Sequence, residues 1–440
     1  MELLEWQKPL AEQATRELKE GCVFALGACT GAGKTYVCCE TIRRVGLPTL
    51  VIAPKVSLTQ WRQVVDGMGV KDLVIDVINP EQISKPSGCR YYTRDGGWQN
   101  LPYPCLLVVD EIHRGCSSHD SVTTKAVVKF GAKKVRPLNK LIALSATMAD
   151  SPFKLAVLGY WMGFHRYVEA SWYDWLRAHG CSYVDIGWGR SRKRVFAFTT
   201  NRKRAMETMA SIRRDMGTRF LSVTPDDIPG FPENTVETVL VDLAKKDHDA
   251  LVKAYEEMPD QFRKLGEDDM VRTLRLRQQA EFCKAQVLAD MAADLVEDEG
   301  VSVFIAVNFT ETRKRIGKRL SERGVPHAEI YGGQSDSERQ AGINSFQANV
   351  TTVMVGMMQA CSVALSLHDV HHARRRVSLI SPGYSASELV QALGRIRRVG
   401  GTAAVQKIVF AADSVEERVE RTVGRKVACI DTLNDRELMR

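Results

Sequence analysis

The sequence predicts an α/β protein made of two domains, each built on a doubly wound, mostly parallel sheet. With 440 residues, the chain is long for a single domain. Short apolar runs typical of buried parallel strands alternate with helix-length segments in both halves. Between the halves, three prolines and a glycine interrupt regular structure. We therefore expect a first domain over residues 1–223, a linker over 224–236 and a second domain over 237–440.

The first half alternates strands and helices. Residues 5–20 repeat apolar side chains at helical spacing, and a second helix is expected over residues 36–45. This alternation implies right-handed crossovers between parallel strands. The expected strands are 22–26, 49–53, 73–78, 105–109 and 141–144.

The second half repeats this architecture. Residues 243–297 are rich in charge and have the pattern of helices. A second series of apolar runs then predicts another parallel sheet. The expected strands are 301–307, 328–331, 351–355, 377–380 and 405–411.

A glycine-rich stretch after the first expected strand has the pattern of a phosphate-binding loop. Small residues let backbone N–H groups turn toward an anion, and the following helix directs the positive end of its dipole there. Lys34 can then contact the β- and γ-phosphates of a nucleotide, and the Thr35 hydroxyl can hold Mg²⁺. The usual pattern begins with glycine, whereas here Ala28 follows Gly27. The loop residues are Ala28, Cys29, Thr30, Gly31, Ala32, Gly33, Lys34 and Thr35.

Two adjacent carboxylates, Asp110 and Glu111, follow the apolar run over residues 105–109. A buried parallel strand that ends in an acidic pair is typical of the mouth of a nucleotide site. We expect Asp110 to hold Mg²⁺, directly or through water, and Glu111 to orient and deprotonate the attacking water. The alternative is a strand capped by solvated acids, which the phosphate-loop pattern upstream disfavours.

The second half has no phosphate loop, but it carries an arginine motif that can complete the site. Arg395 and Arg398 are three residues apart, so on a helix they share a face and can both reach a γ-phosphate. We therefore expect ATP to bind in a cleft between the two domains. The alternative is a basic helix end on the surface.

Three further segments allow more than one interpretation. The turn-rich insert at residues 85–104 contains two adjacent tyrosines and Trp98. It can pack on its own domain, which we favour, or stack against a base at a fork or junction.

The aromatic residues of 153–180 are expected to pack between helices rather than against bases. The basic segment 190–214 is either a solvated face or a contact with a phosphate backbone.

Charge and cysteine usage narrow the class of protein. The net charge of +8 permits a nucleic-acid partner without requiring one. The eleven cysteines are scattered and include no Cys-x-x-Cys pair, which argues against a zinc site and fits a reducing compartment. We find no signal-peptide pattern and no apolar run long enough to span a bilayer. We expect a soluble cytoplasmic protein, a monomer with no membrane partner.

Taken together, these stretches resemble the motifs of superfamily 2 helicases and translocases, in the same order across nearly the whole chain. The resemblance implies two RecA-like domains. The stretch Gln391–Arg398, which resembles motif VI, and the residues 399–401 that follow it are similar to the same region of Swi/Snf-type duplex translocases. The compact length and the segment 98–102 resemble small helicases of phages and large DNA viruses, some of which drive branch migration. The matching stretches are Ala28–Thr35, Ala53–Lys55 with Gln60 and Trp61, the DEXH box Asp110–His113, Ser145–Thr147, Val303–Thr310, Gly356–Asp369 and Gln391–Arg398.

The resemblance also implies roles for residues outside the phosphate loop. Gln7 would recognise adenine, as in a Q motif. The residues that would couple the nucleotide site to the nucleic-acid face are His113, Ser145, Thr147 and Gln391. The residues that would lie near the phosphate backbone are Lys55, Thr310 and Ser362. One departure is motif V, where residues 357–362 lack the glycine-rich run that relatives often carry.

We therefore predict an ATP-dependent DNA helicase or translocase that uses Mg²⁺ and acts on duplex, forked or junction DNA, with branch migration as one form. An RNA helicase is the alternative, because DEXH boxes occur in both groups. A nucleotide-gated nucleic-acid-binding module that does not translocate is a third hypothesis, disfavoured by the intact catalytic set. A phage-encoded chain would work in the host cytoplasm.

Overall fold

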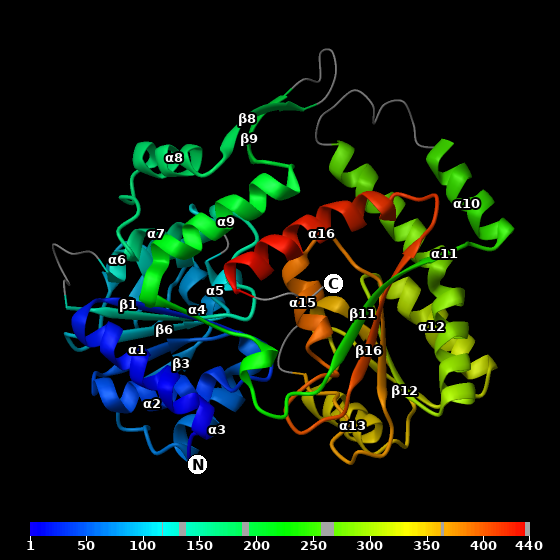
Figure 1. Cartoon of the computed structure of the whole chain (residues 1–440), viewed down its shortest axis with the longest axis horizontal. Helices are drawn as coiled ribbons and strands as arrows, with labels where there is room; N and C mark the ends of the chain where they lie inside the picture. Colours follow the sequence, from blue (N-terminus) through cyan, green and yellow to red (C-terminus); the bar gives the residue numbers. More distant parts are fainter. Residues whose placement is uncertain (117, 132–137, 187–192, 257–267, 362–364, 436–440) are drawn as a thin grey trace. The chain divides into compact units, whose positions relative to one another are not determined.

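The computed structural model describes residues 1–116, 118–131, 138–186, 193–256, 268–361 and 365–435. The chain forms two compact units, each with one six-stranded, all-parallel sheet (Figure 1). This confirms the predicted α/β fold with two parallel-sheet domains. The first unit comprises residues 1–182, 198–229 and 428–437, and the second comprises 183–197, 230–427 and 438–440.

The sheet of the first unit has the strand order β10-β1-β7-β6-β2-β3. Its central strands are buried on both faces, which explains their continuous apolar sequences. All five predicted strands are present. An unpredicted edge strand, β10, pairs with β1. The strands are β1 (Val23–Ala28), β2 (Thr49–Ile52), β3 (Val74–Ile78), β6 (Leu106–Asp110), β7 (Lys140–Leu144) and β10 (Phe220–Val223).

Local sequence signals set the ends of several helices in this unit. Helix α2 begins after Gly33 and ends at Gly46, and both glycines adopt left-handed backbone, with φ of 72° and 70°. The helix predicted from residue 5 begins with a 3-10 turn. The helical elements are η1 (Glu5–Gln7), α1 (Lys8–Glu20), α2 (Lys34–Val45), η2 (Lys55–Ser57), α3 (Leu58–Gly67), α4 (Pro80–Ser84), α5 (Ile112–Gly115), α6 (Val122–Phe130), η3 (Pro152–Leu155), α7 (Ala156–Trp161), α8 (Glu169–Ala178), α9 (Arg202–Met216), η5 (Gly217–Arg219) and η6 (Pro225–Asp227).

The insert at residues 85–104 forms an antiparallel hairpin of β4 (Tyr92–Thr93) and β5 (Gly97–Trp98). The ring of Trp98 packs edge-on against Tyr92 and Phe130, with centroid distances of 5.2 Å in both cases. Its Nε1 donates a hydrogen bond to the carbonyl of Ala126 at 2.7 Å. The hairpin therefore packs on its own unit, as favoured from the sequence.

The aromatic residues of α8 are also packed, as expected. Trp172 and Trp175 are 4% and 8% exposed, and their rings stack with centroids 5.5 Å apart. The basic segment that follows is divided between β9 and α9. Residues 190–192 lie outside the described part of the chain.

The sheet of the second unit has the order β11-β16-β15-β12-β14-β13. Small and branched side chains of α11 pack on β12 and α12 to form its core. The strands are β11 (Asn234–Val241), β12 (Ser302–Val307), β13 (His327–Ile330), β14 (Val353–Met357), β15 (Arg376–Ile380) and β16 (Ala404–Ala411). The helices are α10 (Lys245–Glu256), α11 (Asp268–Glu299), α12 (Thr310–Glu322), α13 (Asp336–Gln347), α14 (Met358–Cys361), α15 (Ala386–Leu393) and α16 (Glu416–Leu433).

Three boundaries differ from the sequence-based expectation. Strand β11 begins at Asn234, inside the segment 224–236 that was expected to be linker. Residues 428–437, at the end of α16, group with the first unit rather than the second. A separate two-stranded sheet, formed by β8 (Cys181–Ile186) and β9 (Lys193–Phe198), interrupts the first unit in sequence.

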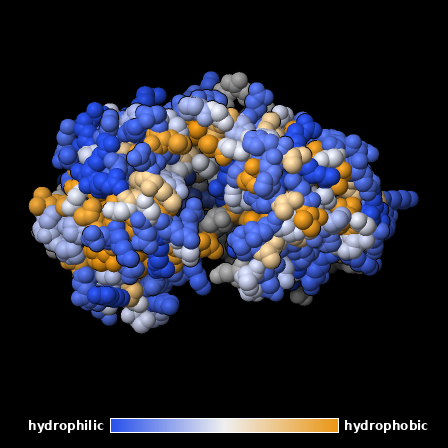
Figure 2. All heavy atoms as spheres, turned by 90° about the horizontal axis from the view of Figure 1, so that it is seen from below, coloured by the Kyte–Doolittle hydropathy of each residue, from blue (hydrophilic) through white to orange (hydrophobic). Residues whose placement is uncertain are grey.

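The face of the molecule drawn in Figure 2 is largely hydrophilic, with apolar side chains in scattered patches. The large apolar side chains that are buried belong mainly to the strands and to the helices that cover them. In the described part of the chain, no helix combines the length and apolarity needed to cross a membrane.

The buried position of Tyr92 generates a stability prediction. Tyr92 is 2% exposed, so the Tyr92→Ala variant should lose about 3 kcal/mol of unfolding free energy in urea denaturation, because a buried ring is replaced by a cavity. Tyr183 is 50% exposed, and Tyr183→Ala should cost less than about 1 kcal/mol. Equal, small losses for both variants would mean that the hairpin does not depend on packing.

Candidate nucleotide-binding site

The phosphate loop connects β1 to α2 at the carboxyl edge of the first sheet. Gly31 and Gly33 have φ of 88° and 72°, a region that glycine adopts far more readily than other residues. Lys34 is the first residue of α2, and its Nζ donates to the Ala28 carbonyl at 3.1 Å. Because the first N–H groups of a helix have no partners within it, the start of α2 presents donors and the positive end of its dipole to the loop.

Gln7 reaches this loop from η1. Its Nε2 donates to the Ala32 carbonyl at 3.2 Å, and its Oε1 accepts from the backbone N–H of Leu4 at 3.1 Å. A Cβ atom at Gly33 would lie 2.5 Å from that Nε2, so only glycine leaves room for the contact. The structure therefore brings Gln7 to the phosphate loop, whereas its recognition of adenine stays a prediction.

Asp110 ends β6, and the parallel register aligns it with Leu144 on the neighbouring strand. Its Oδ2 accepts a hydrogen bond from Nε1 of Trp61 at 2.8 Å, and its Oδ1 accepts from the backbone N–H of Glu111 at 3.0 Å. Burial raises the pKa of Asp110 to about 6 and the Glu111 charge adds to this, whereas Trp61 and Lys34 oppose it. The Asp110 carboxylate and the Thr35 hydroxyl are oxygen donors of the kind that Mg²⁺ prefers, so their chemistry fits the expected ion.

The contact from Trp61 was missed in the sequence, although Trp61 itself was assigned to a motif. Its ring is 1% exposed in the amphipathic helix α3. A buried indole N–H requires an acceptor, but the sequence does not show which group supplies it.

Glu111, His113 and Ser145 form a buried hydrogen-bonded group at the same edge. The Ser145 hydroxyl donates to Glu111 Oε2 at 3.2 Å and lies 2.8 Å from His113 Nδ1. Because the hydroxyl has a single proton, this arrangement places a proton on His113 Nδ1. Glu111 has a left-handed backbone with φ of 48°, which is uncommon outside glycine and concentrates at functional sites.

The charge states in this group follow from burial and neighbours. Burial alone raises the pKa of Glu111, but His113, Lys34 and Ser145 hold it below its usual value. Burial lowers the pKa of His113 to about 4, and the Glu111 charge only partly opposes this. Thr147 completes the group, since its Oγ1 lies 3.3 Å from Nδ1 of His113 and its N–H donates to the Ser145 hydroxyl at 2.9 Å. At neutral pH we expect an ionised Glu111 beside a neutral His113.

The prediction that Arg395 and Arg398 share a helical face is wrong, because α15 ends at Leu393 with Gly394 as its cap. Both arginines lie beyond the helix. Their guanidinium groups nevertheless converge, since Nη1 of Arg395 and Nη2 of Arg398 donate to the same Leu365 carbonyl at 3.1 and 2.7 Å. Gln391 lies in α15 and is 1% exposed.

The three residues expected near the phosphate backbone are in different situations. Lys55 is exposed in η2, directly after the carboxyl end of β2. Thr310 is exposed at the first position of α12, after β12. Ser362 lies outside the described residues. The structure therefore places Lys55 and Thr310 at the carboxyl edges of their own sheets.

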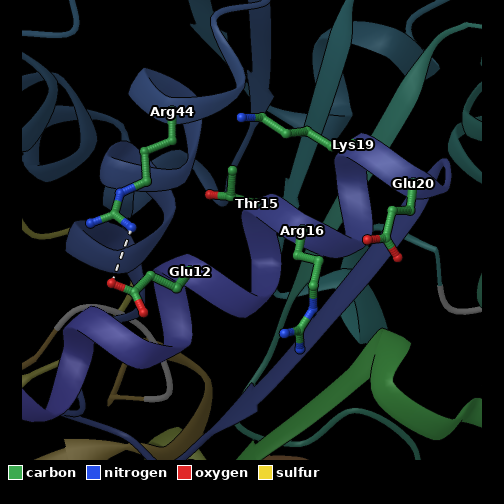
Figure 3. Close-up of a pocket in the computed structure, with 6 residues that line it drawn as sticks. All are labelled: Glu12, Thr15, Arg16, Lys19, Glu20 and Arg44. Carbon is green, nitrogen blue, oxygen red and sulfur yellow. Dashed lines mark ion pairs between the residues drawn. The ribbon is translucent and has the colours of Figure 1, made fainter.

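A separate groove lies on the surface between α1 and α2 (Figure 3). Its lining mixes both signs of charge, and Arg44 pairs with Glu12 at 3.6 Å across it. None of the predicted site residues belongs to this groove. The residues that line it are Glu12, Thr15, Arg16, Lys19, Glu20 and Arg44.

The environment of His113 generates a prediction about its titration. Histidine titration followed by NMR should give a pKa of about 4 for His113, because burial disfavours the imidazolium. In the Glu111→Gln variant the pKa should fall further, because the carboxylate that favours the cation is gone. Titration of His113 near the peptide value of about 6.5 would contradict a buried, uncharged imidazole.

Comparison with known proteins is consistent with this geometry. Residues 284–400, in the second unit, match the family described as the helicase conserved C-terminal domain. A protein of Acanthamoeba polyphaga mimivirus, named as a candidate ATP-dependent RNA helicase, is 28% identical over 439 residues, covering 93% of this chain and 79% of that protein. Together with the two parallel-sheet units, these similarities support a superfamily 2 helicase.

Proposed function

We propose that this protein hydrolyses ATP at the phosphate loop and uses the reaction to move along or unwind nucleic acid. One observation carries the proposal. The hydrogen-bonded group of Glu111, Ser145 and His113 lies at the same sheet edge as the phosphate loop. An ionised carboxylate in that position is suited to accept a proton from an attacking water.

Each residue has a defined role in this proposal. Lys34 contacts the phosphates, and Asp110 with Thr35 holds Mg²⁺, which when bound neutralises charge on the phosphate oxygens. Glu111 orients the water and takes its proton. Arg395 and Arg398 of the second unit stabilise charge on the transferred phosphoryl group, an effect of roughly 10³ to 10⁵ in rate. The residues proposed to couple hydrolysis to nucleic-acid binding are His113, Ser145, Thr147 and Gln391.

For the nucleic acid, we propose RNA as the first candidate. The similarity to a mimivirus protein named as a candidate RNA helicase supports RNA rather than the DNA favoured by the sequence alone. DNA is the second candidate, supported by the likeness of motif VI to that of duplex translocases. Lys55 and Thr310 are proposed to contact the backbone, which both nucleic acids share.

The catalytic assignment is tested by ATP hydrolysis in the presence of nucleic acid. Glu111→Gln should lower kcat by about 10² to 10⁴-fold, because the proton acceptor is lost. Lys34→Ala should abolish stimulated hydrolysis, whereas Lys19→Ala, a surface lysine of the α1 groove, should match the wild type. Equal rates of ATP hydrolysis in the wild type and all three variants would contradict the proposal. If single-stranded or duplex DNA stimulates ATP hydrolysis more strongly than RNA does, DNA becomes the first candidate substrate and RNA the second.

The acid side of the pH profile tests Asp110. Because protons and Mg²⁺ compete for this carboxylate, hydrolysis at limiting Mg²⁺ should fall as the pH drops through about 6, and saturating Mg²⁺ should move the fall to lower pH. The Trp61 hydrogen bond lowers the pKa of Asp110, so the Trp61→Phe variant should lose activity at a higher pH than the wild type. Thermal unfolding of the variant checks that it is folded. An acid limb at the same pH in both proteins would show that Asp110 does not set it.

A further inference from the structure

Arg277 of α11 lies between two loops of the second unit. Its guanidinium carbon is 5.8 Å from the ring centroid of Phe309 and 5.1 Å from that of Tyr384. Phe309 follows β12 and Tyr384 follows β15, and these two strands are hydrogen-bonded neighbours. Arg277 is therefore held by two aromatic rings at the carboxyl edge of this sheet.

Arg277 differs from other arginines of this region, because it has no acidic partner among the residues that the structure describes. Arg315 pairs with Asp247 at 3.2 Å, and Arg319 pairs with Asp290 at 2.8 Å. Within the described ranges, Arg277 makes neither an ion pair nor a hydrogen bond. Its nitrogens are also not buried, since buried nitrogens without partners occur elsewhere in the chain but not in this residue. Its donors therefore face solvent.

The loops on either side of Arg277 are fixed by a buried carboxylate one helical turn away. Glu281 is 1% exposed and accepts from the N–H groups of Asn308 and Phe309 at 2.9 and 3.0 Å. It also accepts from the Ser381 hydroxyl at 2.8 Å. Burial raises the pKa of Glu281, whereas Lys284 and these donors oppose that shift. Because the Asn308, Phe309 and Ser381 groups all donate to it, Glu281 is a common acceptor that joins the two loops.

Gly383 leaves the space that the guanidinium needs. A Cβ atom at this position would lie 3.0 Å from Nη2 of Arg277 and 3.1 Å from Oδ1 of Asn308. The absent side chain thus allows Arg277 to lie against the backbone of the loop after β15. The guanidinium is oriented by its surroundings before any ligand arrives.

We propose that Arg277 binds a phosphate of the nucleic-acid backbone, an inference that rests on the proposed helicase function. A guanidinium presents paired N–H donors that match phosphate oxygens, and its support by two rings limits the freedom lost on binding. Thr310, which is exposed and adjacent to Phe309, begins α12 and extends the polar surface. Among the described residues, no carboxylate pairs with this cation.

Fluorescence anisotropy with a labelled oligouridylate of about 20 nucleotides, repeated with the matching oligodeoxythymidylate, tests this over about 50 to 200 mM NaCl. Arg277→Met keeps much of the side-chain length without the charge and should weaken binding about tenfold. The slope of log K against log salt should decrease in magnitude by about 0.7, the value for one phosphate contact on a single strand. Arg277→Lys, which keeps the charge, should retain the wild-type slope.

Lys318→Met is the matched control, because it removes one positive charge from a side chain that is 80% exposed on α12. Its affinity and slope should equal those of the wild type. A wild-type slope in Arg277→Met would overturn the inference, and so would equal losses in Arg277→Met and Arg277→Lys accompanied by lower melting temperatures. If the wild type binds and its ATP hydrolysis is stimulated, these failures leave the proposed function intact. A wild type that binds neither oligonucleotide would overturn both.

Discussion

The geometry of the first-unit site depends on the position of Ser145. This residue follows β7, the strand between β1, which leads into the phosphate loop, and β6, which ends in the acidic pair. Its N–H donates to the Leu26 carbonyl on β1 at 3.1 Å, and its hydroxyl reaches Glu111 beyond β6. One buried residue thus links both neighbouring strand ends. Without the hydroxyl, a buried imidazole and a buried carboxylate would each lose a partner, which is costly in a low-dielectric interior.

Much of this site could be predicted because its signals are local. The phosphate loop and the strands before Asp110 and Ser145 depend on short contiguous patterns, and parallel pairing then brings their carboxyl ends together. Two of the edge strands were harder to predict. Strand β10 is short, and β11 alternates partly buried and exposed residues within a segment next to prolines. The bond from Trp61 to Asp110 could not be predicted, because it depends on how α3 packs on the sheet.

In the arginine motif, the spacing of three residues predicted the wrong local structure. A separation of three residues suggested one helical face, but Gly394 ends the helix before Arg395. The two guanidinium groups meet because both donate to the Leu365 carbonyl. Burial lowers the pKa of Arg398 to about 10, so it remains charged at neutral pH. The contact of both groups with a phosphoryl group, as proposed, therefore does not need a helix to present them.

The second unit is organised by buried charges on α11. Lys284 is fully buried, and its Nζ donates to the Val409 carbonyl and to Glu416 Oε2, both at 2.6 Å. Glu416 in turn accepts from the N–H of Ala411 at 2.7 Å. Buried ion pairs contribute little net stability, but leaving one partner unpaired is costly, so they select one arrangement over others. Since Glu281 lies one turn earlier on the same helix, this pairing also fixes the rotation at which α11 presents Arg277.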